Sequence, residues 1–222
     1  MMTAQIRLPD ERLRLCAEFV RDGAKLADIG TDHAYLPVWL CQTGKCPSAV
    51  AADINPEPLK RGALTVAEAG LGDRVKTRLS DGLSEICGDE ADDIVIAGMG
   101  GELIAKILGD SMLSREPEKR FILQPMTKSE ALIRWLCDNG FEIIGQDCCV
   151  AAGKCYTVIL ARYCGEKINA DELFCYLGRL RPKENETHLL FVKGHIARLK
   201  KQARGEARFG VLANRLEEIV NG

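Results

Sequence analysis

Short runs of apolar residues alternate with amphipathic stretches through most of the chain. Apolar runs of this length are typical of strands buried on both faces of a sheet, and apolar residues at helical spacing predict covering helices. Glycine, proline or asparagine lies at one or both ends of each amphipathic stretch, where it favours a turn. The strands are expected at 25–29, 49–53, 74–79, 93–97 and 120–124, and the helices at 34–43, 56–69, 101–108 and 129–139.

Two longer strand-like segments follow, at 141–150 and 155–163, separated by Ala-Ala-Gly-Lys. So short a separation predicts a β-hairpin. Repeated strand–helix units followed by a hairpin predict an α/β fold. Its sheet is open and mostly parallel, with helices on both faces and an antiparallel addition at one edge.

The last part of the chain has a different pattern. Apolar residues recur there at alternating spacings of three and four, which predicts a coiled-coil seam, and glycines at 205 and 210 interrupt it. Two antiparallel helices joined by a turn fit this pattern, packed with an upstream helix around 172–180. We expect a domain boundary near 163–167, with domains at 1–164 and 165–222. The seam residues are Leu189, Val192, Ile196, Leu199 and Ala203, then Leu212, Leu216 and Ile219.

Composition removes several classes of protein. The chain of 222 residues has no apolar run near the ~20 residues of a membrane helix, and its first residues are too charged for a signal peptide. The ten cysteines include no C-x-x-C pair and the three histidines are isolated, so neither a metal site nor a disulfide framework is predicted. We therefore expect a cytoplasmic protein without a metal, whose cysteines are mostly buried and whose oligomeric state is undetermined.

Charge is distributed unevenly. From residue 165 onward there are eleven Lys and Arg against eight Asp and Glu, whereas the preceding residues carry a net negative charge. A basic strip in this tail predicts an element that faces a polyanion such as RNA, although a solvated helix face would have the same composition. The candidate RNA-binding residues are Arg198, Lys200, Lys201, Arg204 and Arg208.

The residues after each expected strand are candidates for ligand binding, because open α/β sheets bind ligands at the carboxyl ends of their strands. Gly30 follows the first strand and permits a tight turn, and Asp53 ends the second, where a carboxylate can accept from two ribose hydroxyls. Asp81 follows the third and could accept from an adenine amino group, with Leu83 against the ring. A single aspartate here could be a helix N-cap, but three in register favour an adenosine-containing cofactor.

S-Adenosylmethionine fits these loops better than a nicotinamide dinucleotide. The dinucleotide motif G-x-G-x-x-G needs glycines that admit a pyrophosphate, and here Gly30, Asp32 and Tyr35 occupy those positions. Asp32 would repel a diphosphate. Asp28 suits the ammonium group of a methionine.

Five blocks of the sequence resemble the bacterial tRNA adenine-22 N1-methyltransferase family. They are DIGTDHAYLP, AADINPEPLKRGALTVAEAGL, LSDGL, IVIAGMGGELIAKIL and RFILQPM. The resemblance runs from about residue 12 to 163, more loosely in the tail, and implies a Rossmann-like class I methyltransferase fold with a small coiled-coil tail. Asp32 and Ala34 stand where the general class I pattern has further glycines, a departure that the family shares.

The resemblance implies methyl transfer from S-adenosylmethionine to N1 of an adenine, at position 22 of a tRNA. It also implies a role for each loop. The methionine end of the cofactor would meet Asp28, Gly30, Thr31 and His33; the ribose and adenine would meet Asp53 and Ile54; the adenine, Asp81, Gly82 and Leu83; and the methyl-donor region, Gly98 and Met99.

The end of the fourth strand reads Ala97-Gly98-Met99-Gly100 and lacks the Asn/Asp-Pro-Pro-aromatic motif of enzymes that methylate exocyclic adenine amines. Adenine N1 carries no proton, so its methylation needs positioning and tolerance of positive charge more than a base. We expect Asp32 to supply that electrostatic stabilisation and Tyr35 to stack on or hydrogen-bond the base. Tyr35 could instead pack on its helix, and His33 could be only a loop hydrogen-bonding residue.

Two other functions remain open at this point. The chain could be a cofactor-binding RNA-interaction protein without catalysis, or a NAD-linked oxidoreductase. For a methyltransferase, N1 lies on the Watson–Crick edge, so a paired target adenine would have to be flipped out.

Overall fold

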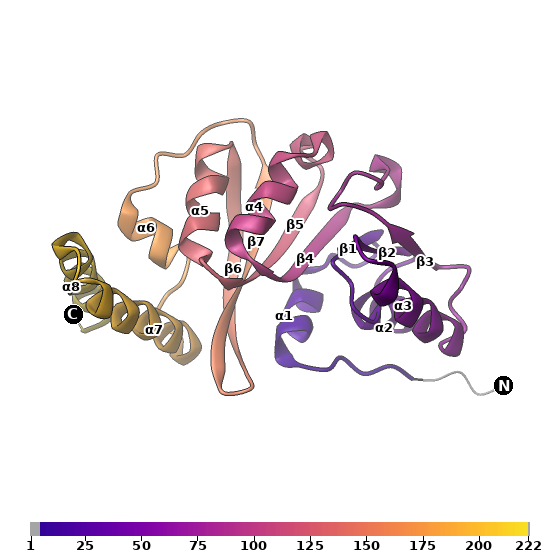
Figure 1. Ribbon diagram of the computed structural model, residues 1–222, viewed down its shortest axis with the longest axis horizontal. Coiled ribbons are helices and arrows are strands. Elements are labelled where there is room, and N and C mark those ends of the chain that lie inside the picture. The colour runs from indigo at the N-terminus through magenta and orange to yellow at the C-terminus, as the bar shows by residue number, and fades with distance from the viewer. Residues whose placement is uncertain (1–4, 222) are drawn as a thin grey trace.

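The computed structural model describes residues 5–221 and contains one seven-stranded sheet of order β3-β2-β1-β4-β5-β7-β6 (Figure 1). The first five strands are parallel, and the hairpin β6–β7 adds to β5 in the antiparallel direction. This confirms the predicted sheet. The strands are β1 (Leu26–Ile29), β2 (Ala49–Asp53), β3 (Val75–Leu79), β4 (Asp93–Gly100), β5 (Arg120–Thr127), β6 (Phe141–Ala151) and β7 (Lys154–Tyr163).

Helices cover both faces of the sheet. One core contains residues of α1, α2 and α3, and a second contains residues of α4, α5 and α6. Successive residues of one strand enter opposite cores: in β4, Val95 packs into the first, and Ile94 and Ile96 into the second. That alternation explains the uninterrupted apolar runs. The helices are α1 (Glu11–Phe19), α2 (Tyr35–Gln42), α3 (Pro56–Glu68), α4 (Gly101–Gly109), α5 (Ser129–Asp138), α6 (Glu172–Leu177), α7 (Glu186–Gln202) and α8 (Ala207–Asn221), with short 3-10 turns at Gly88–Glu90 and Met112–Arg115.

Two differences from the sequence prediction affect the site. Helix α1 was not predicted; Asp10 caps it by accepting from the backbone N–H groups of Arg12 and Leu13. Strands β4 and β5 also continue beyond their predicted ends, with register irregularities around Met99. The longer strands carry the glycines of β4 and the start of α5 to the edge where ligands bind.

The tail forms a helical hairpin with its own core. Val192, Ile196 and Leu199 of α7 and Leu212 and Leu216 of α8 are buried, as the seam predicts. Leu189 is partly exposed, and Ala203 lies just after the end of α7. The structure therefore confirms two packed helices, and their antiparallel coiled-coil geometry stays a prediction.

The tail is also joined to the sheet. Cys148 of β6 belongs to the core of the tail, and Cys175 of α6 belongs to the core on the α4–α5 side of the sheet. Ile168 and Phe174 pack against that same core. The domain boundary near 164 stays a prediction, and residues 168–175 complete the packing of the preceding part.

Among residues 5–221, no helix is long and apolar enough to cross a membrane, and no group of His, Cys, Asp and Glu is arranged to hold a metal ion. The ten cysteines are free thiols and six of them are buried.

Candidate cofactor and RNA site

A cavity of about 480 Å³ opens at the carboxyl ends of β1 and β4. Strand order reverses there, since β1 lies between β2 and β4, and open α/β sheets bind ligands at such a switch point. The walls come from the loop after β1, the beginning of α1, the end of β4, and β5. The lining residues are Pro9, Asp10, Arg12, Leu13, Asp28, Gly30, Thr31, Asp32, His33, Ala34, Tyr35, Leu36, Ala97, Gly98 and Gln124.

The loop after β1 is held against β2. The backbone N–H groups of Gly30 and Thr31 both donate to the carbonyl oxygen of Ala52, at 2.8 and 3.0 Å. Gly30 has a φ of +79°, and a Cβ there would lie 2.0 Å from Cε of Met99. A side chain at position 30 would therefore be strained and would displace Met99. The sequence prediction for Gly30 rested on the same conformational need.

Asp28 forms the buried, acidic part of the cavity. Its side chain accepts from the Thr31 hydroxyl, and only 7% of the residue is exposed. Burial, reinforced by the nearby charge of Asp53, raises the pKa of Asp28 to about 6, although the Thr31 hydrogen bond opposes the rise. A buried carboxylate with so little compensation favours a cationic ligand group such as an ammonium.

This pKa predicts a pH dependence of ligand binding. The ionised form of Asp28 attracts a ligand ammonium group, and the protonated form accumulates below about pH 6. The affinity for S-adenosylhomocysteine should therefore fall about tenfold between pH 7 and pH 5, in proportion to the ionised fraction. Titration calorimetry across this range measures the effect.

The control for this prediction is a matched pair of variants. Asp28→Asn should bind weakly with a flat profile, whereas His33→Gln should keep the wild-type slope. His33 lines the same cavity, so this variant separates its contribution from that of Asp28. A wild-type slope in Asp28→Asn would assign the pH dependence to another group.

Asp53 and Ile54 lie at the end of β2, next to the loop after β1. One oxygen of Asp53 accepts from the backbone N–H of Asn55 at 2.7 Å, which orients the carboxylate. Asn55, rather than Asp53, is the N-cap residue of α3, so the helix-cap alternative does not account for Asp53. Ile54 is 58% exposed. Both positions suit contact with a ligand at this edge, and their roles stay predictions.

The turn after β3 departs from the prediction in one respect. Asp81 is exposed, and Gly82 has a φ of +56° beside Ile107. Leu83, however, is 3% exposed and packs in the core with Ile104 and Leu108. The expected packing of its side chain on an adenine ring is therefore wrong, because the turn directs that side chain into the protein.

Gly98, at the end of β4, lines the cavity, and Met99 follows it in the same strand. Gly98 has a φ of +79°, and its N–H donates to the side-chain oxygen of Gln124 at 3.1 Å. Gln124 is 1% exposed and was not predicted as a site residue. Met99 packs against Gly30, so it closes the turn.

The two expected catalytic residues line the cavity with His33 between them. Tyr35 stacks on the His33 ring, with centroids 5.0 Å apart. Asp32 is 68% exposed at its side chain and forms an ion pair with Arg61 of α3, at 2.5 Å, while His33 lies 3.5 Å from its other oxygen. Arg61 was not predicted, because nothing in the local pattern relates a helix residue to a loop that precedes it by 29 positions.

Helix α1 contributes a further residue that the sequence did not reveal. Arg12 is paired with Asp10, and its guanidinium lies over the ring of Tyr156 in β7, 5.3 Å from the centroid. The same guanidinium lies 2.9 Å from the Met126 sulfur. Arg12 therefore links the cavity to the hairpin edge of the sheet.

Comparison with known proteins agrees with this geometry. A family model described as a methyltransferase domain matches residues 9–159. The tRNA (adenine(22)-N(1))-methyltransferase of Bacillus subtilis is 38% identical over 151 residues, which cover 68% of this chain and 63% of that relative. The crystal structure of the B. subtilis m1A22 tRNA methyltransferase TrmK is 30% identical with a TM-score of 0.84, and the alignment covers 97% of this chain and all of that one. The chain belongs to the tRNA (adenine(22)-N(1))-methyltransferase family.

Ligand complexes are known for two similar structures in this methyltransferase family. One is a putative tRNA (m1A22) methyltransferase of Streptococcus pneumoniae in complex with S-adenosyl-L-methionine, with 29% identity, a TM-score of 0.86 and coverage of 99% of this chain and 100% of that one. The other is TrmK of M. capricolum with S-adenosyl-homocysteine, with 26% identity, a TM-score of 0.78 and coverage of 96% of each chain.

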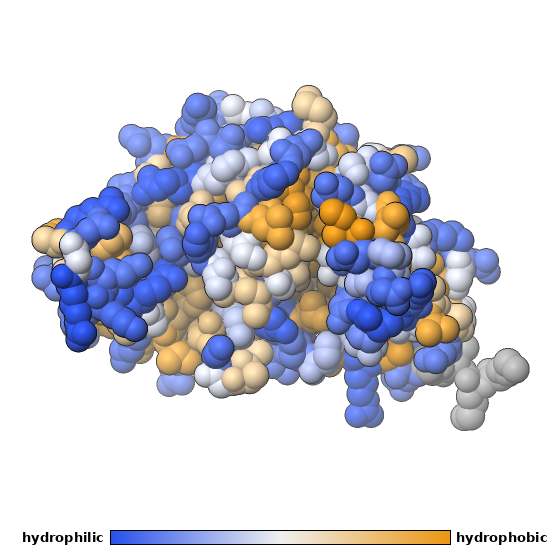
Figure 2. Space-filling view, in the orientation of Figure 1, coloured by the Kyte–Doolittle hydropathy of each residue, from blue (hydrophilic) through white to orange (hydrophobic). Residues whose placement is uncertain are grey.

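The basic strip of this family member lies on and after α7, on a largely hydrophilic surface (Figure 2). Arg198 pairs with Glu130 of α5 at 2.9 Å, so this residue of the strip also has a structural role in joining α7 to α5. Lys200 pairs with Glu217 and Arg208 with Glu206. Lys201 and Arg204 are exposed without an acidic partner in the described part of the chain. Their contact with RNA stays a prediction.

Proposed function

We propose that the protein transfers the methyl group of S-adenosylmethionine to N1 of adenine 22 in tRNA. The observation that carries the proposal is the buried carboxylate of Asp28 at the switch point of the sheet. Two similar proteins of the family bind this cofactor or its product. Such a substrate places the activity in the cytoplasm.

The residues present fit that cofactor at both ends. Asp28 and the turn at Gly30 and Thr31 would hold the methionine ammonium and carboxylate groups, with His33 at the same end. Asp53 is oriented to accept from the ribose hydroxyls, with Ile54 beside it. Asp81, exposed on the next turn, would accept from the adenine amino group. The acidic lining disfavours a dinucleotide, because Asp32 would face the diphosphate.

The end of β4 agrees with methylation at a ring nitrogen. When bound, the cofactor supplies a methyl group on a sulfonium, which adenine N1 takes with its lone pair as the C–S bond breaks. No proton has to leave N1, and Ala97, Gly98 and Met99 supply no side-chain base. This chain's residues would instead align the base, exclude water and offset the positive charge of the methylated ring.

Asp32 and Tyr35 are the proposed groups on the adenine side. The ion pair with Arg61 orients the Asp32 carboxylate and leaves most of its surface open to the cavity mouth. Tyr35, stacked on His33, would add its ring or hydroxyl to the target base.

Replacing Asp32 tests its electrostatic role. Asp32→Asn should lower the single-turnover methylation rate at least about tenfold, or ~1.4 kcal/mol of transition-state stabilisation, with cofactor affinity within a few-fold of wild type. Arg61→Gln, which keeps the carboxylate, should retain the rate within a few-fold. If Asp32→Asn turned over at the wild-type rate, Asp32 would have no part in the chemistry.

Mass spectrometry of nucleosides tests the function itself. The tRNA is incubated with the protein and methyl-labelled cofactor, digested, and analysed for methylated adenosines. We expect labelled 1-methyladenosine, lost when adenine 22 is replaced by guanine. Binding of tRNA and S-adenosylhomocysteine without any labelled nucleoside would favour a non-catalytic binding protein, and calorimetric binding of NADH would favour an oxidoreductase.

A further inference from the structure

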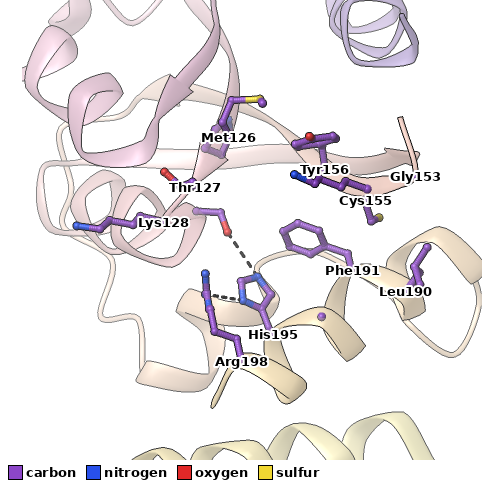
Figure 3. A pocket seen from close by; sticks show the side chains of 14 residues that line it. Met126, Thr127, Lys128, Gly153, Cys155, Tyr156, Leu190, Phe191, His195 and Arg198 are labelled. Atoms are coloured by element: carbon purple, nitrogen blue, oxygen red, sulfur yellow. Dashed lines mark hydrogen bonds between the residues drawn. The ribbon is translucent and has the colours of Figure 1, made fainter. Parts of the chain in front are cut away.

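A second cavity, of about 400 Å³, lies between the sheet and the tail. Its walls are the β5–α5 turn, the tip of the β6–β7 hairpin and one side of α7 (Figure 3). We call it the hairpin groove. The lining residues are Pro125, Met126, Thr127, Lys128, Ser129, Gly153, Lys154, Cys155, Tyr156, Leu190, Phe191, Gly194, His195 and Arg198.

Two partly exposed aromatic rings line the groove from opposite elements. Tyr156 comes from β7 and Phe191 from α7, and both rings lie within one close view of the groove (Figure 3). Phe191 is held in place by edge-on packing against His195, with centroids 4.7 Å apart. Nucleobases stack on aromatic side chains of this kind irrespective of sequence.

The charged residues of the groove are all cationic. Lys128, Lys154 and Arg198 line it, and within residues 5–221 no Asp or Glu does. Lys128 and Arg198 are each paired with a glutamate outside the groove, Glu102 and Glu130. Lys154, at the hairpin tip, is exposed and has no acidic partner in the described chain. The groove therefore favours an anion, with Lys154 as the uncompensated charge.

His195 is an uncharged residue of the groove that holds neighbouring side chains in place. Burial, assisted by the adjacent Arg198, lowers its pKa to about 3, so the ring is neutral at physiological pH. Arg198 donates to Nδ1 at 2.9 Å, which leaves the proton on Nε2, 3.5 Å from the Ser129 hydroxyl. The ring thus fixes Arg198 and Phe191 on one wall.

The hairpin groove adjoins the cofactor cavity but has the opposite charge. Three aspartates line the cofactor cavity, Asp10, Asp28 and Asp32, whereas cations line the groove. Arg12 belongs to the cavity wall and contacts Met126 and Tyr156 of the groove. An RNA with one base in the cofactor cavity would therefore place its neighbouring nucleotides beside the groove.

We propose that the hairpin groove binds a second nucleotide of the substrate RNA, distinct from the methylated adenine. The base lies against Tyr156 and Phe191, and its phosphate lies at Lys154 and Arg198. The proposal rests on the proposed function for its substrate, and it names a subsite whose occupation would hold the RNA while the target adenine is unstacked.

Binding of an unmodified tRNA transcript by three groove variants tests the proposal. Lys154→Ala should raise the Kd about three- to tenfold and lower the salt slope by roughly 0.7–0.9, the value of one phosphate contact. Tyr156→Leu should raise the Kd at least about fivefold, whereas Tyr156→Phe, which keeps the ring, should bind with the wild-type Kd. The matched control is Lys76→Ala, an exposed lysine of β3 at the other edge of the sheet.

Affinity for S-adenosylhomocysteine is measured in parallel and should be unchanged in Lys154→Ala, because Lys154 does not line the cofactor cavity. Wild-type Kd and salt slope in Lys154→Ala, together with wild-type Kd in Tyr156→Leu, would overturn the subsite. Equal losses in Tyr156→Leu and Tyr156→Phe would exclude stacking. If groove variants weaken tRNA binding but the wild type forms no 1-methyladenosine, the subsite stands and the methylation function fails.

Discussion

Neutralising the basic strip of the tail is expected to weaken tRNA binding roughly 10²–10³-fold near 0.1 M salt. The variant replaces Lys200, Lys201, Arg204 and Arg208 by glutamine. Each phosphate contact releases counterions, so loss of four contacts should flatten the slope of log affinity against log salt by about 3. Filter binding of tRNA at several salt concentrations measures both quantities.

Arg198 is left unchanged in this variant because its ion pair with Glu130 ties α7 to α5. Deleting the tail would be less informative, since removal from residue 165 onward also takes Ile168, Phe174 and Cys175 from the packing of the sheet. A control variant, Lys25→Gln with Lys76→Gln, lies outside the tail and should shift the slope by less than one contact. An unchanged slope in the strip variant would make the strip a solvated face.

Replacing Asp53 by alanine is expected to weaken S-adenosylhomocysteine binding by about 1.5–3 kcal/mol, or roughly 10- to 150-fold. The carboxylate, oriented by the Asn55 N–H, would otherwise accept from both ribose hydroxyls. Because Asp53 is the last residue of β2, loss of its side chain removes little packing. Titration calorimetry measures the affinity, and thermal unfolding of the cofactor-free protein reports on the fold.

Two comparisons make the Asp53 result specific. Asp53→Asn keeps one acceptor oxygen and should fall between wild type and Asp53→Ala. Asp73→Ala removes an exposed carboxylate from the α3–β3 turn, and its affinity should match that of wild type. Wild-type affinity in Asp53→Ala would remove the residue from the cofactor site.

Local pattern was enough for the architecture. The buried strands are recognisable as apolar runs because both of their faces are covered. The tail helices are recognisable because their apolar residues recur at spacings of three and four. Gly30 and the aspartates after the strands were also predictable, because a parallel sheet brings the ends of its strands to one edge. These features depend on residues that are neighbours in sequence or on a topology that the order of elements restricts.

Contacts between segments that are distant in sequence could not be predicted from the local pattern. The pairing of Asp32 with Arg61, the position of Arg12 over Tyr156 and the link from Arg198 to Glu130 each join elements that are separate in sequence. The burial of Leu83 depends on how one turn meets α4. Surface charges and turns carry no periodic signal, so their partners are settled by how the packed elements lie against one another. For that reason the loops after β1 and β4 that line the first cavity could be predicted from the order of elements, whereas the hairpin groove, whose walls come from β5, β7 and α7, exists only in the folded chain.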